Sequence, residues 1–209
     1  MKGALHWLLP KFIALGVVLA IASIGNAFAA PVDLCGQYRA ILTREAQAVF
    51  GLVAPVPMLA GQMRQESSCR ASVTAWDNGR GLAQFMDPTA EQVSRSYPEI
   101  GPPDPYNPVW AIRALVRYDS WLYERVRGDN GCERWAAALK GYNAGLGYVQ
   151  RAQRLSPAPG AWFGATENIN AGQAVKNFDY SRRYPHVVLF THQPLYIAWG
   201  TPTCMERKP

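Results

Sequence analysis

The chain has 209 residues, of which 49% are hydrophobic and 17% are charged, so it is long and apolar enough to form one packed globular domain. This composition excludes a disordered or low-complexity protein. The formal net charge of +6 favours an anionic partner. Because the arginines are scattered and no basic run contains interleaved aromatic residues, we do not expect nucleic acid to be that partner.

Residues 1–29 have the pattern of an export signal. Two lysines flank the start of the segment, residues 12–24 are an apolar run, and Ala27-Phe28-Ala29 supplies the small residues that a signal peptidase accepts. We therefore predict cleavage after Ala29 or Ala30 and a periplasmic or extracellular protein, with an uncleaved membrane anchor as the alternative. Removing the two lysines leaves 19 basic and 15 acidic residues, a net charge of +4, which suits an acidic cell-wall polymer or a membrane surface.

The four cysteines, Cys35, Cys69, Cys132 and Cys204, all follow this segment and would meet an oxidising compartment after export. We therefore expect two disulfides. Three pairings are possible, and we favour Cys35 with Cys204 and Cys69 with Cys132, because the first bridge would join the two ends of the domain. No two cysteines are close enough for a CxxC motif and histidines are few, so we expect neither a metal site nor a cofactor.

Apolar residues recur at helical spacing through most of the remaining chain. The pattern predicts helices over about 36–53, over 58–66, from Asp87-Pro88, from Asn107-Pro108 and around 135–142. A Pro/Gly-rich loop follows at 156–164, and residues 187–190 form a possible short strand. There are no internal repeats. We therefore predict a mainly α single domain.

Glu66 is the candidate catalytic residue. No GxSxG elbow with a matching Ser-His pair occurs, and the single GxG at Gly79-Arg80-Gly81 lacks a preceding strand. Glu66, by contrast, is placed at the C-terminal end of a predicted amphipathic helix, where the helix dipole disfavours a carboxylate and apolar neighbours raise its pKa. A Glu that stays protonated near neutral pH can donate a proton to a glycosidic oxygen.

Four ordered motifs resemble one known family. The stretch ESSCRASVTAWDNGRGLAQFMDPTAEQV, which begins at Glu66, looks like the catalytic-Glu segment of the soluble-type lytic transglycosylase (SLT) domains. DPYNPVWAIRAL resembles the family's Asn-Pro helix start, WAAALKGYNAG carries its Tyr-Asn-Ala-Gly motif, and YSRRYPHVV can be aligned with its Glu-Thr-x-x-Tyr motif. Tyr180 stands where the last motif has Glu, and Ala83 stands where the family usually has Met.

This resemblance implies the fold and the domain organisation. It implies a mainly α, lysozyme-like helical single domain with a groove, preceded by the N-terminal signal segment. The expected organisation is a signal peptide or anchor at 1–29, an N-terminal helical segment at 30–57, a lytic transglycosylase catalytic domain at 58–188 and a C-terminal tail at 189–209 that a disulfide ties back.

The resemblance also implies the chemistry, with Glu66 as the single acid/base. In that family the Glu protonates the oxygen that leaves N-acetylmuramic acid (MurNAc) at the β-1,4 bond to N-acetylglucosamine (GlcNAc). It then accepts a proton from the 6-hydroxyl of the same MurNAc, which closes onto the anomeric carbon and leaves 1,6-anhydroMurNAc. One carboxylate suffices because the nucleophile is already attached to the substrate.

The matching positions imply five substrate-binding residues. Ser67 could orient the Glu66 carboxyl or a sugar substituent, or could simply be a helix-end hydroxyl. Gln84 is placed to bind the N-acetyl group or sugar hydroxyls. Tyr142 matches the family Tyr whose hydroxyl holds the Glu, and Tyr184 is similar in kind; Asn143 fits a sugar contact or a helix-end cap.

Two further residues near Glu66 bear on the alternatives. Asp77 could activate a water, although Asp77-Asn78-Gly79 also has the pattern of a turn. Trp76 is the aromatic residue best placed to stack on sugar.

The alternatives to a lytic transglycosylase are a lysozyme-type hydrolase of the same bond and a non-catalytic cell-wall-binding protein. The expected partner is the peptidoglycan glycan strand, in wall turnover, a secretion or conjugation apparatus, or phage lysis.

Overall fold

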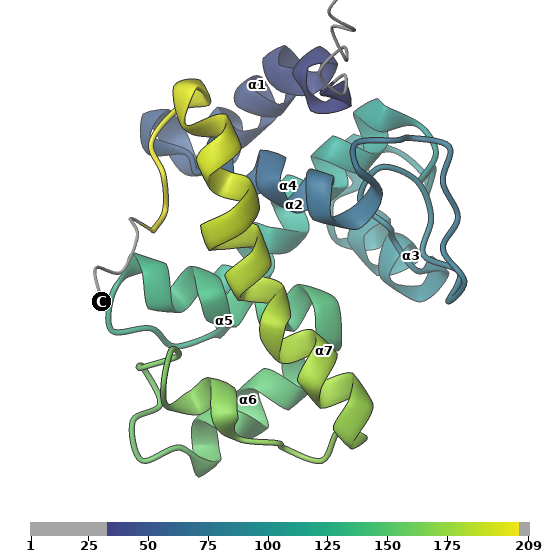
Figure 1. The fold of residues 1–209 in the computed structure, drawn as a ribbon. Helices are drawn as coiled ribbons and strands as arrows, with labels where there is room; N and C mark the ends of the chain where they lie inside the picture. The colour runs from purple at the N-terminus through teal and green to yellow at the C-terminus, as the bar shows by residue number, and fades with distance from the viewer. Residues whose placement is uncertain (1–32, 205–209) are drawn as a thin grey trace, which may run out of the picture. The chain divides into compact units, whose positions relative to one another are not determined.

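The computed structural model describes residues 33–204, so the predicted signal segment lies outside the described residues (Figure 1). The helices are α1 (Arg39–Phe50), α2 (Val56–Ser67), α3 (Asp87–Ser96), α4 (Pro108–Arg125), α5 (Gly131–Ala144), α6 (Leu146–Leu155) and α7 (Val175–His186). Short 3-10 helices occur at Leu34–Tyr38, Gly51–Val53, Pro98–Ile100, Thr166–Asn168 and Gln193–Trp199. Residues 33–204 form no β-strand beyond isolated bridges at residues 74–85. The predicted mainly α fold is confirmed.

Local signals in the sequence set several helix ends. The Asn107 side chain accepts a hydrogen bond from the Val109 N–H at 3.0 Å, and Pro108 occupies the first turn of α4. Gly145 ends α5 with a φ of +97°, a conformation that favours glycine. At α3 the expected cap is shifted by one residue, since Met86 takes the capping position and Asp87 is already helical.

The strand predicted at 187–190 is wrong. Residues Val187–His192 form a π-helical segment that continues directly from α7. Val188 and Leu189 are almost fully buried, and this segment packs against α2. The β-branched run therefore reflects burial of an apolar surface within a continuing helix, and tertiary packing overrides the local strand propensity.

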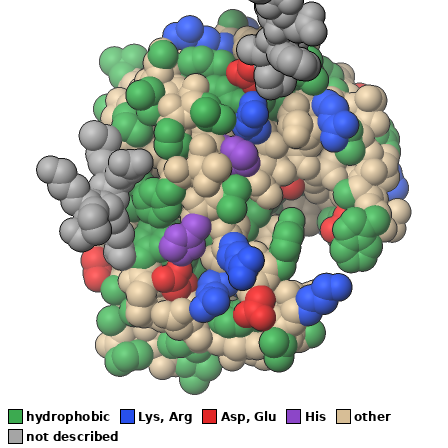
Figure 2. Space-filling view, viewed as in Figure 1, with side chains coloured by type: hydrophobic (Ala, Val, Ile, Leu, Met, Phe, Trp, Pro, Cys, Tyr) green, Lys and Arg blue, Asp and Glu red, His purple; other side chains and the backbone are tan. Residues whose placement is uncertain are grey.

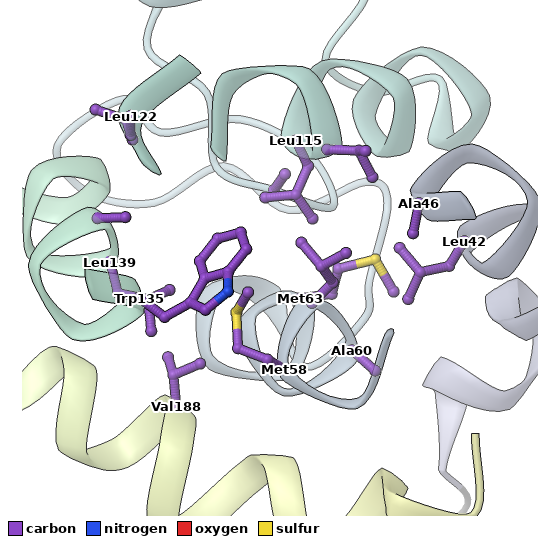
Figure 3. Packing of buried hydrophobic residues seen from close by; sticks show 14 of the residues in the cluster. Leu42, Ala46, Met58, Ala60, Met63, Leu115, Leu122, Trp135, Leu139 and Val188 are labelled. Carbon is purple, nitrogen blue, oxygen red and sulfur yellow. The ribbon is translucent and has the colours of Figure 1, made fainter. Parts of the chain in front are cut away.

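Helix α2 runs through the hydrophobic core. Every residue from Val56 to Met63 is buried, and side chains from α1, α4, α5 and the segment after α7 converge on Met58 and Met63 (Figure 3). Only its last turn changes character, because Arg64, Gln65 and Glu66 are partly exposed. Glu66 thus lies where the core helix meets the surface.

The disulfide pairing that we favoured from the sequence is wrong. The structure joins Cys35 to Cys69, with Cα atoms 5.1 Å apart, and Cys132 to Cys204, with Cα atoms 5.0 Å apart. Cys69 follows the end of α2, which packs against the 3-10 helix that contains Cys35. The second bridge ties the C-terminal segment to the first turn of α5. Local packing, and not closure of the longest loop, decides the pairing.

Candidate functional site

An open cleft of about 210 Å³ lies at the exposed end of α2. Its walls come from the end of α2, the loop between α2 and α3, the end of α5 and one face of α7. The side chains in it that carry chemistry are those of Glu66, Trp76, Asp77, Gln84, Tyr142, Asn143, Tyr180 and Tyr184. Of the six site residues predicted from the sequence, the cleft brings together five; Ser67 does not line it.

Glu66 lies at the floor of the cleft with a tyrosine as its hydrogen-bond partner. The Tyr184 hydroxyl of α7 donates to Glu66 Oε1. Burial raises the pKa of Glu66 to about 7, the Tyr184 hydrogen bond opposes this rise, and the negative charge of Asp77 adds to it. The carboxyl group can therefore hold a proton near neutral pH and release it when a stronger base is formed in the cleft.

We expected the Tyr142 hydroxyl to hydrogen-bond to Glu66, but the structure places the Tyr184 hydroxyl there. The Tyr142 hydroxyl donates to the Ala83 backbone carbonyl at 2.6 Å, so Tyr142 holds the wall of the cleft in place and its ring lines the cleft. Tyr142 comes from α5 and Tyr184 from α7, and Lys140 of α5 donates a hydrogen bond to Ser181 of α7. The two tyrosine-bearing helices are thereby fixed side by side, and Tyr184 is the residue that contacts the acid.

The conformation of the loop that contains Gln84 depends on a close backbone contact at Gly81 and on a hydrogen bond from the Gln84 side chain to the Gly81 carbonyl. Gly81 is required there, because its φ is +70° and a Cβ atom would lie 1.7 Å from the Pro105 carbonyl oxygen. Gln84 also has a left-handed backbone, with a φ of +51°, and its Nε2 donates to the Gly81 carbonyl at 2.7 Å. Its amide N–H groups are engaged by the loop, so its amide oxygen is the group left for a ligand.

Ser67 supports the site from below the cleft. It is buried, and its hydroxyl donates to the Leu82 carbonyl at 2.8 Å and accepts from the Arg70 N–H at 3.1 Å. The residue next to Glu66 therefore joins α2 to the Gln84 loop. This contact makes Ser67 a residue that positions the two walls relative to each other.

Polar and aromatic groups at the cleft remain available to a ligand. The Asn143 side chain makes no hydrogen bond within residues 33–204, and it lines the cleft. The Trp76 side chain is 96% exposed and that of Tyr180 is 65% exposed, although both belong to the lining. Asp77 also forms the predicted turn, since its Oδ1 accepts from the Gly79 N–H at 3.2 Å.

Two residues behind the cleft were not recognised from the sequence. Asp119 of α4 and Gln62 of α2 are both fully buried, and Gln62 Nε2 donates to Asp119 Oδ1 at 3.4 Å. The signal was present, because Asp119 is four residues after Leu115 and falls on the apolar face of the predicted helix. A carboxyl group on such a face requires an explanation.

Metal ligands do not gather in the part of the chain that the structure describes: no three His, Cys, Asp or Glu side chains there lie close enough to hold an ion. The same described residues contain no helix that is both long and apolar enough to cross a bilayer.

Three similar solved structures share the fold at low sequence identity. An inactive Glu-to-Gln mutant of lytic transglycosylase Slt from Pseudomonas aeruginosa has a TM-score of 0.56 at 23% identity, over 79% of this chain and 25% of that chain. The 70 kDa soluble lytic transglycosylase SLT70 from Escherichia coli has a TM-score of 0.59 at 21% identity, over 81% and 26% of the two chains. A complex of the 70-kDa soluble lytic transglycosylase with bulgecin A has a TM-score of 0.59 at 22% identity, over the same shares of the two chains.

The chain therefore spans about a quarter of the length of these proteins. A comparison with curated protein sequences gave no match. A comparison with protein families matched residues 52–162 to the family described as "Transglycosylase SLT domain". This match includes Glu66, the Gln84 loop and the Tyr142-Asn143 motif, and it extends over more than half of the chain. The chain belongs to the transglycosylase SLT domain family.

Proposed function

We propose that this protein is a peptidoglycan lytic transglycosylase that cleaves the MurNAc–GlcNAc β-1,4 bond with Glu66 as its single acid/base. One observation carries the proposal. Glu66 sits at the floor of a cleft, its pKa is raised to about 7 by burial, and the hydrogen bond that it receives comes from a neutral tyrosine. A protonated carboxyl group in such a cleft is suited to general acid catalysis on a glycosidic bond.

The chemical step needs no water and no second carboxylate. Glu66 gives its proton to the glycosidic oxygen as the bond from that oxygen to C1 of MurNAc breaks, and GlcNAc leaves with a new hydroxyl. The 6-hydroxyl oxygen of MurNAc then bonds to C1, and its proton passes to Glu66. The acid is thereby restored, and the product carries a 1,6-anhydro bridge. The intramolecular nucleophile replaces the second carboxylate of ordinary glycosidases.

The roles of the other cleft residues follow from the polar atoms and aromatic rings that they leave available to a ligand. Because Tyr184 binds Oε1 of Glu66, Oε2 is the oxygen that carries the proton to the substrate. The Gln84 oxygen and the Asn143 amide can pair with N-acetyl or hydroxyl groups of the sugars. Trp76 and Tyr180 offer exposed rings on which sugar faces can stack.

The surface charge supports a polymer with acidic groups as the substrate. Lysine and arginine side chains gather over α7, the helix that forms one wall of the cleft (Figure 2). Peptide-bearing glycan strands carry carboxylates, so this basic surface favours their approach. We infer that the segment at 1–29 exports the protein to the periplasm or the exterior, where such strands are found; wall turnover, a secretion or conjugation apparatus, and phage lysis are all compatible settings.

The solved structures add support at the level of the family. The inactive form of Slt from Pseudomonas aeruginosa differs from its parent by the exchange of a Glu for Gln. Loss of activity through this minimal exchange is the behaviour expected of a protein that depends on one acid, and Glu66 is the carboxyl group placed for that role here.

Mass spectrometry of released muropeptides tests the proposal. Purified peptidoglycan would be digested with protein that lacks residues 1–29, in parallel with the Glu66→Gln variant. We expect wild-type products that lack one water relative to reducing-end muropeptides, and no products from the variant. Equal product release by both proteins would refute the role of Glu66, and the absence of products from both would favour a wall-binding protein.

A lysozyme-type hydrolase is the second candidate, because Asp77 lines the same cleft and its charge acts on Glu66. In that reaction Asp77 would activate a water that attacks C1, and the products would have reducing ends. Reducing-end products that disappear in Asp77→Asn would establish this alternative. Anhydro products that persist in Asp77→Asn would exclude it.

A further inference from the structure

A buried carboxyl group lies behind the cleft floor without a counter-ion. Asp119 is fully buried in α4, and no ion pair within residues 33–204 includes it. Its hydrogen-bond partner is the equally buried amide of Gln62, whose Nε2 lies 3.4 Å from Asp119 Oδ1. A carboxylate in such a place would be strongly destabilising, because burial removes its hydration and no cation among the described residues pairs with it.

Two atoms of this pair lack a hydrogen bond. Gln62 Oε1 and Asp119 Oδ2 are buried, and neither has a partner among the described residues. If Asp119 is ionised, both atoms are acceptors and cannot bond to each other. A single proton on Oδ2 would supply the missing donor: Oδ2–H could then donate to Gln62 Oε1, while Gln62 Nε2–H donates to Oδ1. One proton thus accounts for both unsatisfied atoms.

The pair is close to the catalytic acid. Gln62 and Glu66 are one turn apart on α2 and share a face of that helix. The ionisable groups that interact with Asp119 are Glu66 of α2, Tyr118 of α4 itself, Tyr142 of α5 and Tyr184 of α7. Burial, and then the charge of Glu66, raise the pKa of Asp119 well above its usual range, whereas the Gln62 hydrogen bond lowers it.

We propose that Asp119 is a positioning residue for Glu66: it stays a neutral carboxylic acid, joined to Gln62 by two hydrogen bonds, and fixes α4 against the face of α2 that carries Glu66. This inference rests on the proposed function in giving Glu66 the role of the acid. Glu66 becomes an anion when it releases its proton to the substrate. A second anion in the same buried region would oppose that release, whereas a neutral Asp119 leaves Glu66 free to lose and regain its proton.

The first experiment follows both carboxyl groups directly by NMR in protein labelled with ¹³C at the Asp and Glu carboxyl carbons. We expect the Glu66 signal to titrate near pH 7 while the Asp119 signal, assigned by its absence in Asp119→Asn, stays at its protonated position. An Asp119 signal that titrates below Glu66 would overturn the proposal. So would a lower Glu66 midpoint in Asp119→Asn, because removal of a negative charge would have that effect.

A second experiment compares three variants by melting temperature and by the Glu66 midpoint. Asp119→Asn can form the same pair of hydrogen bonds with Gln62, so we expect it to keep both values. Asp119→Leu leaves the Gln62 amide unsatisfied and should lower the melting temperature by roughly 3–10 °C and shift the Glu66 midpoint. The double variant Gln62→Leu/Asp119→Leu should recover most of the melting temperature, because both partners are then apolar.

These results separate the inference from the proposed function. Neither the NMR titration nor the melting temperatures need peptidoglycan cleavage, so they would test the Asp119–Gln62 pair even if the enzyme proved inactive. If Asp119→Leu matched wild type in both readouts, or if Asp119→Asn were as harmful as Asp119→Leu, the proposed pair would be refuted.

Discussion

Glu45 of α1 and Glu66 of α2 are two glutamates in partly buried positions with opposite electrostatics. Glu45 is 7% exposed and lies between Arg113, at 3.3 Å, and Arg117, at 3.4 Å. Burial acts to raise the pKa of Glu45, but the hydrogen bonds and charges of the two arginines outweigh it, so that its pKa is lowered. For Glu66 no cation within residues 33–204 opposes burial, and its pKa rises to about 7.

The difference between the two residues teaches that burial alone does not produce an acid catalyst. Both positions remove the carboxyl group from water, and the partner then decides which protonation state is stable. Glu45 is held as an anion and joins α1 to α4 as a structural ion pair, whereas Glu66 is kept neutral by the absence of a counter-charge. A stable protein thus uses the same side chain for packing at one place and for chemistry at another.

The largest expected effect is that of Glu66→Gln on cleavage. Because the amide cannot donate a proton as an acid does, we expect the rate to fall by about 10²–10⁴-fold. Binding to peptidoglycan, measured by co-sedimentation with purified wall, should be retained. If the variant cleaved at the wild-type rate, the raised pKa that distinguishes Glu66 from Glu45 would have no role in catalysis.

Removal of the counter-charge at Glu45 should affect stability and not chemistry. Arg117→Met takes away one of the three arginines that pair with Glu45, and it also removes the partner of the exposed Glu99. Because the buried Glu45 is then less compensated, we expect a loss of about 2 kcal/mol in unfolding free energy at neutral pH. The pKa of Glu45 is lowered by folding. The ion pair therefore stabilises above the unfolded-state value of 4.5, and the stabilisation is lost as pH falls through the folded value.

Urea unfolding at several pH values measures this prediction. Glu45→Gln/Arg117→Met is the matched control, because it also removes the charge that is left behind and should recover part of the loss. Unchanged stability of Arg117→Met at neutral pH would contradict the structural role of the pair.

Glu66→Gln should also stabilise the fold at alkaline pH. A carboxyl group whose pKa rises on folding from 4.5 to about 7 contributes stability that is complete below 4.5 and lost as pH rises through 7. At pH 8 the wild-type protein carries a poorly solvated charge that the glutamine variant lacks. We expect the variant to be more stable there by about 3 kcal/mol, and equal stability of the two proteins in urea unfolding would argue against the raised pKa.

Tyr184→Phe and Tyr142→Phe form a matched pair that separates the two tyrosines. The Tyr184 hydrogen bond lowers the pKa of Glu66, so its loss should move the pH midpoint of cleavage upward and reduce the rate by about tenfold. Tyr142 bonds to the Ala83 carbonyl, so its loss should act on KM by loosening the loop and leave the midpoint in place. The reverse pattern would mean that Tyr142 holds the acid in solution.

The smallest expected effect is that of Asp77→Asn. The negative charge of Asp77 raises the pKa of Glu66, and its removal should move the midpoint of cleavage to slightly lower pH. Asp77 is exposed, so solvent screens this interaction and the rate at acidic pH should change by no more than about threefold. A larger loss of rate would give Asp77 a direct part in the reaction.

Much of the fold and of the site could be predicted because the signals are local. Capping residues and prolines indicate where helices begin, and the position of Glu66 at the end of an apolar helix requires only the sequence near it. The same sequence window, with the motifs that resemble SLT domains, indicates the Gln84 loop. These features depend on neighbours along the chain.

The rest depends on contacts between distant parts of the chain. Tyr184 is 118 residues from Glu66, and whether it or Tyr142 contacts the acid is decided by how α5 and α7 pack. The pairing of Cys35 with Cys69 follows from the docking of the first turn on α2. The apolar run at Val187 is helical because α2 buries it. None of these contacts leaves a periodic pattern in the sequence.

The pH dependence of kcat/KM for peptidoglycan cleavage by the wild-type protein tests the central claim most directly, because it reports the ionisation of the free enzyme. If Glu66 must start the reaction with its proton, kcat/KM falls as pH rises, with a midpoint near 7, and the released muropeptides are anhydro products throughout. A fall centred near the ordinary glutamate value of 4.5, or a rate that increases through neutral pH, would contradict a buried, protonated Glu66 as the catalytic acid.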